Sequence, residues 1–264
     1  MKTRRNLPLC LVLLLATNAQ AVSLTWDTTT GDSLVSGGNG NWNTTSTTWT
    51  ADAGASNIAW PSVSSGDDDA IFDGIGGTIA VQTAGVTAND VTFNVADYVL
   101  NGGFLLLDGA APKIIATADA TINTTLAGSN GLVKSGAGIL TLTAANTYTG
   151  NTTVEQGSLI LSGGNNRIST LNNIVFSGNS FVDFDENEQT IANLQITTAT
   201  VSTVGALDNG KLTINGASDL TVSPTILSGN TLAEVDATLV GTDALSDLAI
   251  LKLDLSTRRF KDQP

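Results

Sequence analysis

The sequence predicts an all-β protein that folds as a parallel β-helix, and three observations carry this prediction. Two short segments, 139–143 and 158–162, alternate apolar and polar residues, as strands with one buried face do. The leucines of the first segment recur 19 positions later, and a fixed step of roughly 20 residues is typical of stacked solenoid rungs. Asn-Gly and Gly-rich corners, which tolerate positive φ, separate the apolar pieces. An antiparallel β-sandwich is the main alternative, and the near-constant step favours the helix.

The composition is that of a folded, turn-rich β protein. The 264 residues include 27 glycines, 41% are hydrophobic and 13% are charged. This hydrophobic fraction is enough to build a core, so the chain does not belong to the disordered class. Its length suits one large all-β domain.

Residues 1–21 have the three parts of a secretory signal peptide. Three basic residues among the first five form a positive n-region, residues 9–16 an apolar core, and residues 19–21 an A-x-A cleavage site. The apolar core is too short for a stable membrane-spanning helix, so we expect cleavage after Ala21 and a mature chain without a transmembrane segment. The sequence therefore predicts export to the extracellular space or the outer-membrane-associated cell surface, with the periplasm as the alternative.

The mature chain is expected to be strongly acidic. The whole chain has 11 Lys+Arg and 24 Asp+Glu, and the signal peptide removes three basic residues, so eight basic and 24 acidic residues leave a net charge of −16. This charge disfavours binding to nucleic acid or to an anionic membrane, since both would repel it. The single cysteine, Cys10, lies in the signal peptide, so no disulfide is expected.

Residues 22–72 differ from the rest because they contain all four tryptophans: Trp26, Trp42, Trp49 and Trp60. A solenoid exposes an open apolar end at its first rung, and bulky side chains can cover it. We therefore predict an N-terminal Trp-rich cap over this region. The competing hypothesis is a carbohydrate platform, in which tryptophan faces stack on sugars.

Residues 73–250 form a series of short apolar runs with corners between them, and we assign this region to the β-helix. Leu212 and Ile214 lie 18 positions beyond Leu194 and Ile196, which predicts that these pairs stack in neighbouring rungs. The expected strands outside the central segments are Val91–Phe93, Tyr98–Leu100, Phe104–Leu107, Lys113–Ala116, Thr121–Thr124, Ile174–Phe176, Phe181–Phe184, Ile191–Ile196 and Leu220–Val222.

One segment, 131–162, also carries a family pattern. Gly131–Leu142 reads GLVKSGAGILTL, Asn146–Val154 reads NTYTGNTTV, and Gly157–Leu161 closes the pattern with a leucine-rich strand. This segment resembles the autotransporter-associated β-strand repeat of passenger domains in secreted bacterial surface proteins. The resemblance implies a right-handed parallel β-helix and a scaffold role without catalytic residues.

Two acidic segments are the candidates for chemistry. Asp67–Asp69 is predicted to be a solvated acidic turn, since adjacent side chains of an extended chain point to opposite faces and make a poor calcium cage. Asp183 and Asp185 would share one face if their strand continues, so they are the best candidates for the paired carboxylates of a glycoside hydrolase. With Asn187 they also open an EF-hand pattern, which later positions do not complete. A solvated acidic corner is the simpler interpretation.

Enzyme chemistry has little support elsewhere in the sequence. The chain has no histidine, which excludes histidine bases and histidine metal sites. No serine lies in a G-x-S-x-G elbow. Basic residues of the β region are scattered, whereas a polysaccharide lyase needs them beside acidic sugar groups. We therefore assign no catalytic, cofactor-binding or metal-binding residue, and we expect no cofactor.

Residues 251–264 form a basic tail. Lys252, Arg258, Arg259 and Lys261 supply four of the eight basic residues of the mature chain. Autotransporters end in a membrane barrel of many alternating strands, and little room for one remains after Ile214. The sequence leaves open a truncated passenger or a short secreted member of the family released by another route.

Together these features predict a secreted, non-catalytic β-helical scaffold at or outside the cell surface, with adhesion as one use. Two alternatives stay open: a polysaccharide-acting β-helix enzyme that uses Asp183 and Asp185, and a carbohydrate-binding module that uses the tryptophans. The candidate partner is a cell-surface or extracellular polysaccharide, and nucleic acid is not expected to bind.

Overall fold

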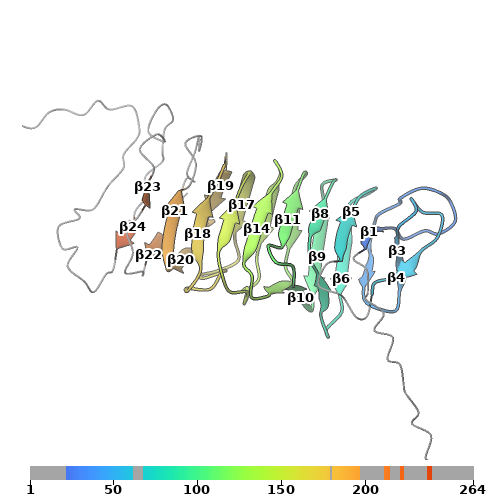
Figure 1. Cartoon of the computed structure of the whole chain (residues 1–264), viewed down its shortest axis with the longest axis horizontal. Coiled ribbons are helices and arrows are strands. Elements are labelled where there is room, and N and C mark those ends of the chain that lie inside the picture. Colours follow the sequence, from blue (N-terminus) through green and yellow to red (C-terminus); the bar gives the residue numbers. More distant parts are fainter. Residues whose placement is uncertain are drawn as a thin grey trace, which may run out of the picture.

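The protein is an elongated parallel β-helix whose strands lie side by side along one axis (Figure 1). The computed structural model describes residues 22–61, 68–178, 180–196, 211–214, 221–222 and 237–239. All regular secondary structure in these residues is β-strand, which confirms the predicted all-β class. The predicted signal peptide (1–21) and basic tail (251–264) lie outside the described residues.

The described strands belong to four sheets. The eleven-stranded sheet contains, in order of pairing, β23 (Thr221–Val222), β21 (Asn193–Ile196), β18 (Asn173–Phe176), β16 (Thr152–Val154), β14 (Leu132–Ser135), β11 (Lys113–Ala116), β8 (Val91–Phe93), β5 (Asp69–Phe72), β1 (Ser23–Trp26), β3 (Thr47–Thr50) and β4 (Ile58–Ala59). The seven-stranded sheet contains β19 (Ser180–Asp183), β17 (Gly157–Leu161), β15 (Ile139–Leu142), β12 (Ala120–Ile122), β9 (Tyr98–Gly102), β6 (Thr78–Val81) and β2 (Gly40–Trp42). One three-stranded sheet contains β13 (Thr125–Ala127), β10 (Phe104–Leu107) and β7 (Val86–Ala88), and the other contains β20 (Glu188–Ile191), β22 (Lys211–Ile214) and β24 (Ala237–Leu239).

Consecutive strands of a rung go to different sheets, which gives the central helix three sides. β8, β9 and β10 lie in the eleven-stranded, the seven-stranded and a three-stranded sheet, and β11, β12 and β13 repeat this order. Each of these strands pairs in parallel with its counterpart one rung later. The chain therefore winds around one apolar core, as the solenoid prediction requires.

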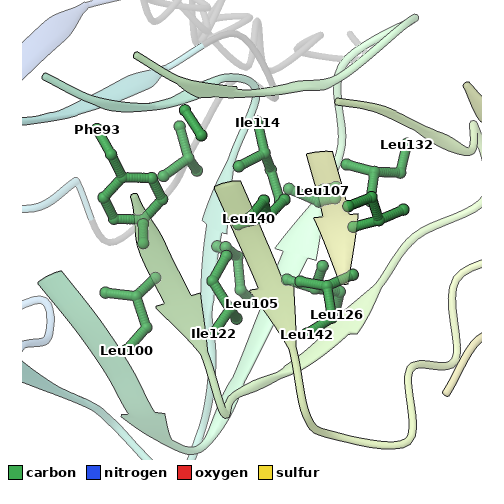
Figure 2. Packing of buried hydrophobic residues seen from close by; sticks show 14 of the residues in the cluster. Phe93, Leu100, Leu105, Leu107, Ile114, Ile122, Leu126, Leu132, Leu140 and Leu142 are labelled. Carbon is green, nitrogen blue, oxygen red and sulfur yellow. The ribbon is translucent and has the colours of Figure 1, made fainter. Parts of the chain in front are cut away.

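The register of β15 and β17 confirms the predicted step. Leu140 pairs with Leu159 and Leu142 pairs with Leu161, at 19 residues per rung. All four side chains are buried in the apolar cluster that fills the centre of the helix, and Figure 2 shows Leu140 and Leu142 within it. The step widens to 23 residues between Leu159 and Val182, because the corners before and after β18 and β18 itself are longer than their counterparts around β16.

The register departs from the prediction in the C-terminal rungs. β22 pairs in parallel with β20, which puts Leu212 opposite Gln189. The predicted stacking of Leu212 and Ile214 on Leu194 and Ile196 is therefore wrong. The single strand expected at this point is split into β20 and β21, which belong to different sheets. Residues 18 positions apart here lie on different sides of the helix, because β21 belongs to the eleven-stranded sheet and β22 to a three-stranded sheet.

The N-terminal end is closed by the predicted cap. β3 pairs antiparallel with β1, and β4 pairs antiparallel with β3, so the parallel ladder stops there. The four tryptophans are each at most 1% exposed. Trp49 lies at their centre, with ring centroids 5.1 Å from Trp26, 5.1 Å from Trp42 and 4.6 Å from Trp60. Phe72 continues this aromatic column and stacks on Phe93 of the next rung at 5.1 Å.

The burial of the tryptophans overturns the carbohydrate-platform hypothesis. Stacking on a sugar needs an open aromatic face, and all four indole rings are buried in one cluster, three of them in contact with Phe72. The tryptophans instead cover the apolar end of the first rung, where edge-to-face contacts add to their burial energy.

Candidate functional site

The acidic corner at Asp183 and Asp185 is a turn rather than a pair of facing carboxylates. β19 ends at Asp183, and the chain turns through Asp185 and Glu186, whose φ values are 47° and 62°. The Asp183 carboxylate accepts the N–H of Asp185 at 2.8 Å, and the Asp185 carboxylate accepts the hydroxyl of Ser162. The expectation that both carboxylates share a strand face is therefore wrong, since the strand does not continue. The Asp183 carboxylate thus hydrogen-bonds within its own turn, as aspartates in turns do, whereas the Asp185 carboxylate bonds to Ser162, just after β17 of the preceding rung.

The acidic segment at the start of β5 is also not the solvated turn that was predicted. Asp67 lies outside the described residues, whereas Asp68 is 2% exposed and its Oδ1 accepts the N–H of Val22 at 3.1 Å. Asp69 accepts the hydroxyl of Ser23 at 3.1 Å and the side-chain amide of Asn89 at 2.9 Å. The two carboxylates therefore tie β1 to the following rungs. Sequence reasoning missed this role because the partners lie 46 and 20 residues away along the chain.

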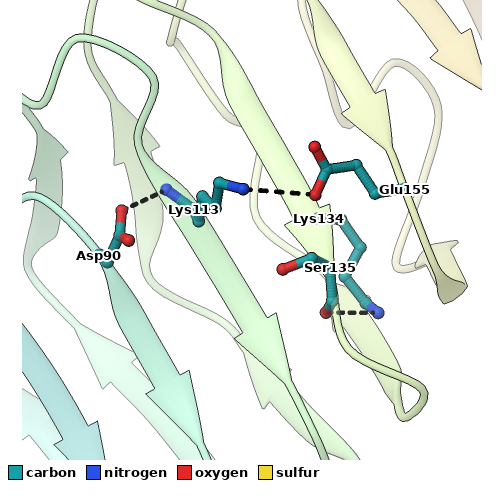
Figure 3. A network of polar contacts seen from close by, with 5 residues as sticks. All are labelled: Asp90, Lys113, Lys134, Ser135 and Glu155. Carbon is teal, nitrogen blue, oxygen red and sulfur yellow. Dashed lines mark hydrogen bonds and ion pairs between the residues drawn. The ribbon is translucent and has the colours of Figure 1, made fainter. Parts of the chain in front are cut away.

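Lys134 is a fully buried cation at the corner between β14 and β15. Its Nζ donates to the carbonyl oxygen of Ser135 at 3.0 Å (Figure 3), and to those of Gly136 at 2.7 Å and Gln156 at 2.9 Å. Gln156 belongs to the next rung, so one ammonium group connects two rungs. Burial lowers the pKa of Lys134 to about 8, and the negative charge of Asp119 opposes this shift.

The sequence did contain a signal for this buried lysine. Lys134 follows Leu132 by two positions in the same strand, so strand alternation places both on the inner face. Gly136 is needed at the same corner because its φ is +79° and a Cβ atom there would lie 2.4 Å from the carbonyl oxygen of Ala116. The Lys-x-Gly part of the repeat pattern is thus one structural unit.

A row of charged residues crosses the outside of the eleven-stranded sheet (Figure 3). The Asp90 carboxylate accepts the backbone N–H of Lys113 at 2.8 Å, and the Lys113 ammonium lies 3.4 Å from the Glu155 carboxylate. Burial raises the pKa of Asp90, and the nearby Asp69 raises it further. The Lys113–Glu155 pair is 39% exposed on each side, so it contributes little to stability.

The middle strands of the seven-stranded sheet, β9, β12 and β15, present an uncharged polar surface instead. We define the polar face as Asn101, Thr121, Asn123, Thr141 and Thr143, which alternate with buried residues on or just beyond β9, β12 and β15. Asn123 Nδ2 donates to Asn101 Oδ1 at 2.7 Å, and the Thr143 hydroxyl donates to Asn123 Oδ1 at 2.5 Å. Amide and hydroxyl groups therefore repeat along the helix axis at the strand spacing of about 4.8 Å.

A second ladder lies on the eleven-stranded sheet. Asn173 Nδ2 donates to Asn151 Oδ1 at 2.9 Å, and Asn193 Nδ2 donates to Asn173 Oδ1 at 3.1 Å. Stacked rungs place like residues in register, so side-chain amides can bond along the axis as they do in other stacked-strand structures. Both ladders depend on how the rungs pair in the folded chain. The amino-acid sequence predicts this pairing only where the number of residues per rung is constant.

Two features are absent from the residues that the structure describes. None of them forms a helix long and apolar enough to cross a membrane. In the same part of the chain, no three side chains of His, Cys, Asp or Glu lie together in a way that could hold a metal ion.

Comparisons with known proteins connect this architecture to a class of surface proteins. Residues 132–161 match the family model described as passenger-associated-transport-repeat. Over 160 residues, 59% of this chain, the sequence is 40% identical to the adhesin BmaC autotransporter of Brucella suis biovar 1 (strain 1330). The chain spans about 5% of the length of that relative. No solved structure matches.

The matched segment coincides with the region where the resemblance was found. It contains β14, β15, β16 and β17, together with the Lys134 corner and the Leu140–Leu159 register. The residues that carry the family pattern are thus the same residues that form these strands of the parallel β-helix. The resemblance is confirmed for this segment: residues 132–161 match the repeat family, and the chain is similar to an autotransporter adhesin.

Proposed function

We propose that this chain is an exported, non-catalytic scaffold at the cell surface, and that its β-helix presents an outer face for adhesion. Its similarity to an autotransporter adhesin supports both export and adhesion. The observation that carries the proposal is the polar face, an uncharged ladder on an otherwise acidic protein.

The polar face suits a ligand that is itself extended and rich in hydroxyl groups. Its hydrogen-bonding groups repeat at a fixed spacing and are held by the strands beneath them, so little side-chain freedom is lost on binding. Amides and hydroxyls both donate and accept hydrogen bonds, as sugar hydroxyls do. A cell-surface or extracellular polysaccharide is therefore the proposed partner class.

The test compares substitutions on two faces of the same helix. The purified mature chain is applied to immobilised polysaccharides of neutral and acidic composition and to matrix proteins. A Thr121→Glu, Thr141→Glu variant places charges on the polar face, while Thr92→Glu, Thr153→Glu makes the same change on the eleven-stranded sheet. We expect binding to be lost only with the first pair. Equal loss in both variants would show that the polar face is not the binding surface.

The absence of catalysis is tested with the same preparations. The chain, with calcium present, should release neither reducing ends nor unsaturated products from the polysaccharide panel. Turnover that disappears in an Asp183→Asn, Asp185→Asn variant would contradict the proposal. The geometry supports the expected result, because the Asp183 carboxylate hydrogen-bonds within its turn and the Asp185 carboxylate accepts the hydroxyl of Ser162 from the preceding rung.

A further inference from the structure

We propose that removal of the signal peptide creates the counter-ion of a buried carboxylate. In the processed chain, the α-ammonium group of Val22 pairs with Asp68 and completes the first rung of the β-helix. This inference rests on the export that forms part of the proposed function and on the predicted cleavage after Ala21.

The position of the Val22 nitrogen is fixed by its surroundings. It lies 3.1 Å from Asp68 Oδ1. On the other side of the residue, the carbonyl oxygen of Val22 accepts the N–H of Asp69 at 2.8 Å. The Val22 side chain packs against the apolar core. An amino terminus formed at this residue is therefore already in hydrogen-bonding position.

Asp68 needs a cation that the neighbouring sequence does not supply. It is 2% exposed, and a buried carboxylate is costly unless it is paired. The sequence contains no lysine or arginine between residues 22 and 112. Lys113 pairs with Glu155, and Lys134 donates to backbone carbonyl oxygens. The α-ammonium group that cleavage creates at Val22 would therefore be the positive group next to Asp68.

Processing changes the strength of this contact. In the precursor, the Val22 nitrogen is a peptide amide with one N–H and no charge. After cleavage it is an ammonium group with three N–H donors, and charge-assisted hydrogen bonds are roughly twice as strong as neutral ones. The pairing of β1 with β5 is thus weaker before cleavage than after it, so completion of the first rung is coupled to export.

The test is a double-mutant cycle on the processed chain, residues 22–264. It compares the free Val22 terminus with an Nα-acetylated terminus, which keeps one N–H but removes the charge. Both forms are made in the parent, in Asp68→Asn and in the control Asp52→Asn, whose carboxylate is exposed in the same cap. We expect acetylation to lower the Tm by roughly 5 °C in the parent and the control, and to have no effect in Asp68→Asn.

An equal drop in Asp68→Asn, or no drop in the parent, would overturn the ion pair. If Asp68→Asn does not fold, hydrogen exchange of the parent decides instead. Acetylation should then speed exchange in β1 and β5 and leave β15 and β17 unchanged, and unchanged exchange in β1 would refute the proposal. N-terminal sequencing of the exported protein should find Val22. Another terminal residue would refute the inference while leaving the adhesion proposal intact.

Discussion

Lys134 shows how a single residue can hold two rungs together. Its ammonium group satisfies three backbone carbonyl oxygens at a buried corner, one of them in the following rung. Lys134→Met keeps the aliphatic length but leaves these acceptors without their donor, so the free energy of unfolding should fall by about 1–3 kcal/mol. Denaturant unfolding measures this change. Lys113→Met, in an exposed ion pair, is the control and should change stability by about 0.5 kcal/mol at most.

The same residue predicts how stability depends on pH. The pKa of Lys134 is about 8 in the folded protein and 10.5 in its ordinary state, so between these values the unfolded chain binds more protons. The free energy of unfolding should therefore rise as the pH increases from 8 towards 10. Above about pH 10 it should fall, because burial raises the pKa of Tyr98 to about 12 and the folded state then keeps a proton that the unfolded chain loses. Urea unfolding from pH 7 to 11 measures both limbs, and Lys134→Met should lack the rise.

Buried charges were the least predictable residues. Strand alternation predicts the burial of Lys134 but not that of Asp68, because the partner of Asp68, the nitrogen of Val22, lies 46 residues earlier in the chain. Asp183 and Asp185 were expected on one strand face if the strand continued past Asp183. The strand ends at Asp183 and Asp185 has a positive φ, so the two residues do not share a strand face. The alternation of apolar and polar residues within a strand predicts which face a residue occupies. The hydrogen-bond partner of a buried charge depends on the pairing between rungs, which this alternation does not show.

At the scale of the strand, the β15–β17 pair defines the register of the central helix. Leu142 is fully buried opposite Leu161, while Thr141 lies on the outer face of the same strand. Leu142→Ala should lower the free energy of unfolding by about 2–5 kcal/mol, because it leaves a cavity in a packed core. Thr141→Ala is the matched control and should cost about 0.5 kcal/mol or less. If the two variants unfold at the same denaturant concentration, the inward orientation of Leu142 is wrong.

Strands could be predicted where alternation and the repeat step agreed. Residues 131–162 satisfy both criteria, and their strands and register match the prediction. Residues 191–196 also have an apparent step, of 18 residues, but the expected strand proved to be two, β20 and β21, which are separated by Ala192 alone. A corner of one residue that is neither Gly nor Pro therefore does not show in the sequence where one strand ends and the next begins.

At the scale of the whole molecule, the ends of the helix are its most vulnerable parts. A parallel solenoid has an open apolar end and unpaired strand edges, which invite association with another chain. Here the antiparallel strands β3 and β4 and the four tryptophans close the N-terminal end. The composition of 22–72 predicted this cap, but not its antiparallel pairing.

Trp49→Ala tests whether the cap protects the helix as well as stabilising it. Trp49 contacts the other three tryptophans and Phe72, so its loss should lower the free energy of unfolding by about 3–5 kcal/mol. It should also loosen the cover over the first rung, so light scattering should detect concentration-dependent association at temperatures where the parent stays monomeric. Leu171→Ala, at an 81% exposed position far from the cap, should change neither property. A Trp49→Ala protein that is less stable yet remains monomeric would separate the two roles and show that the antiparallel edge alone prevents end-to-end contact.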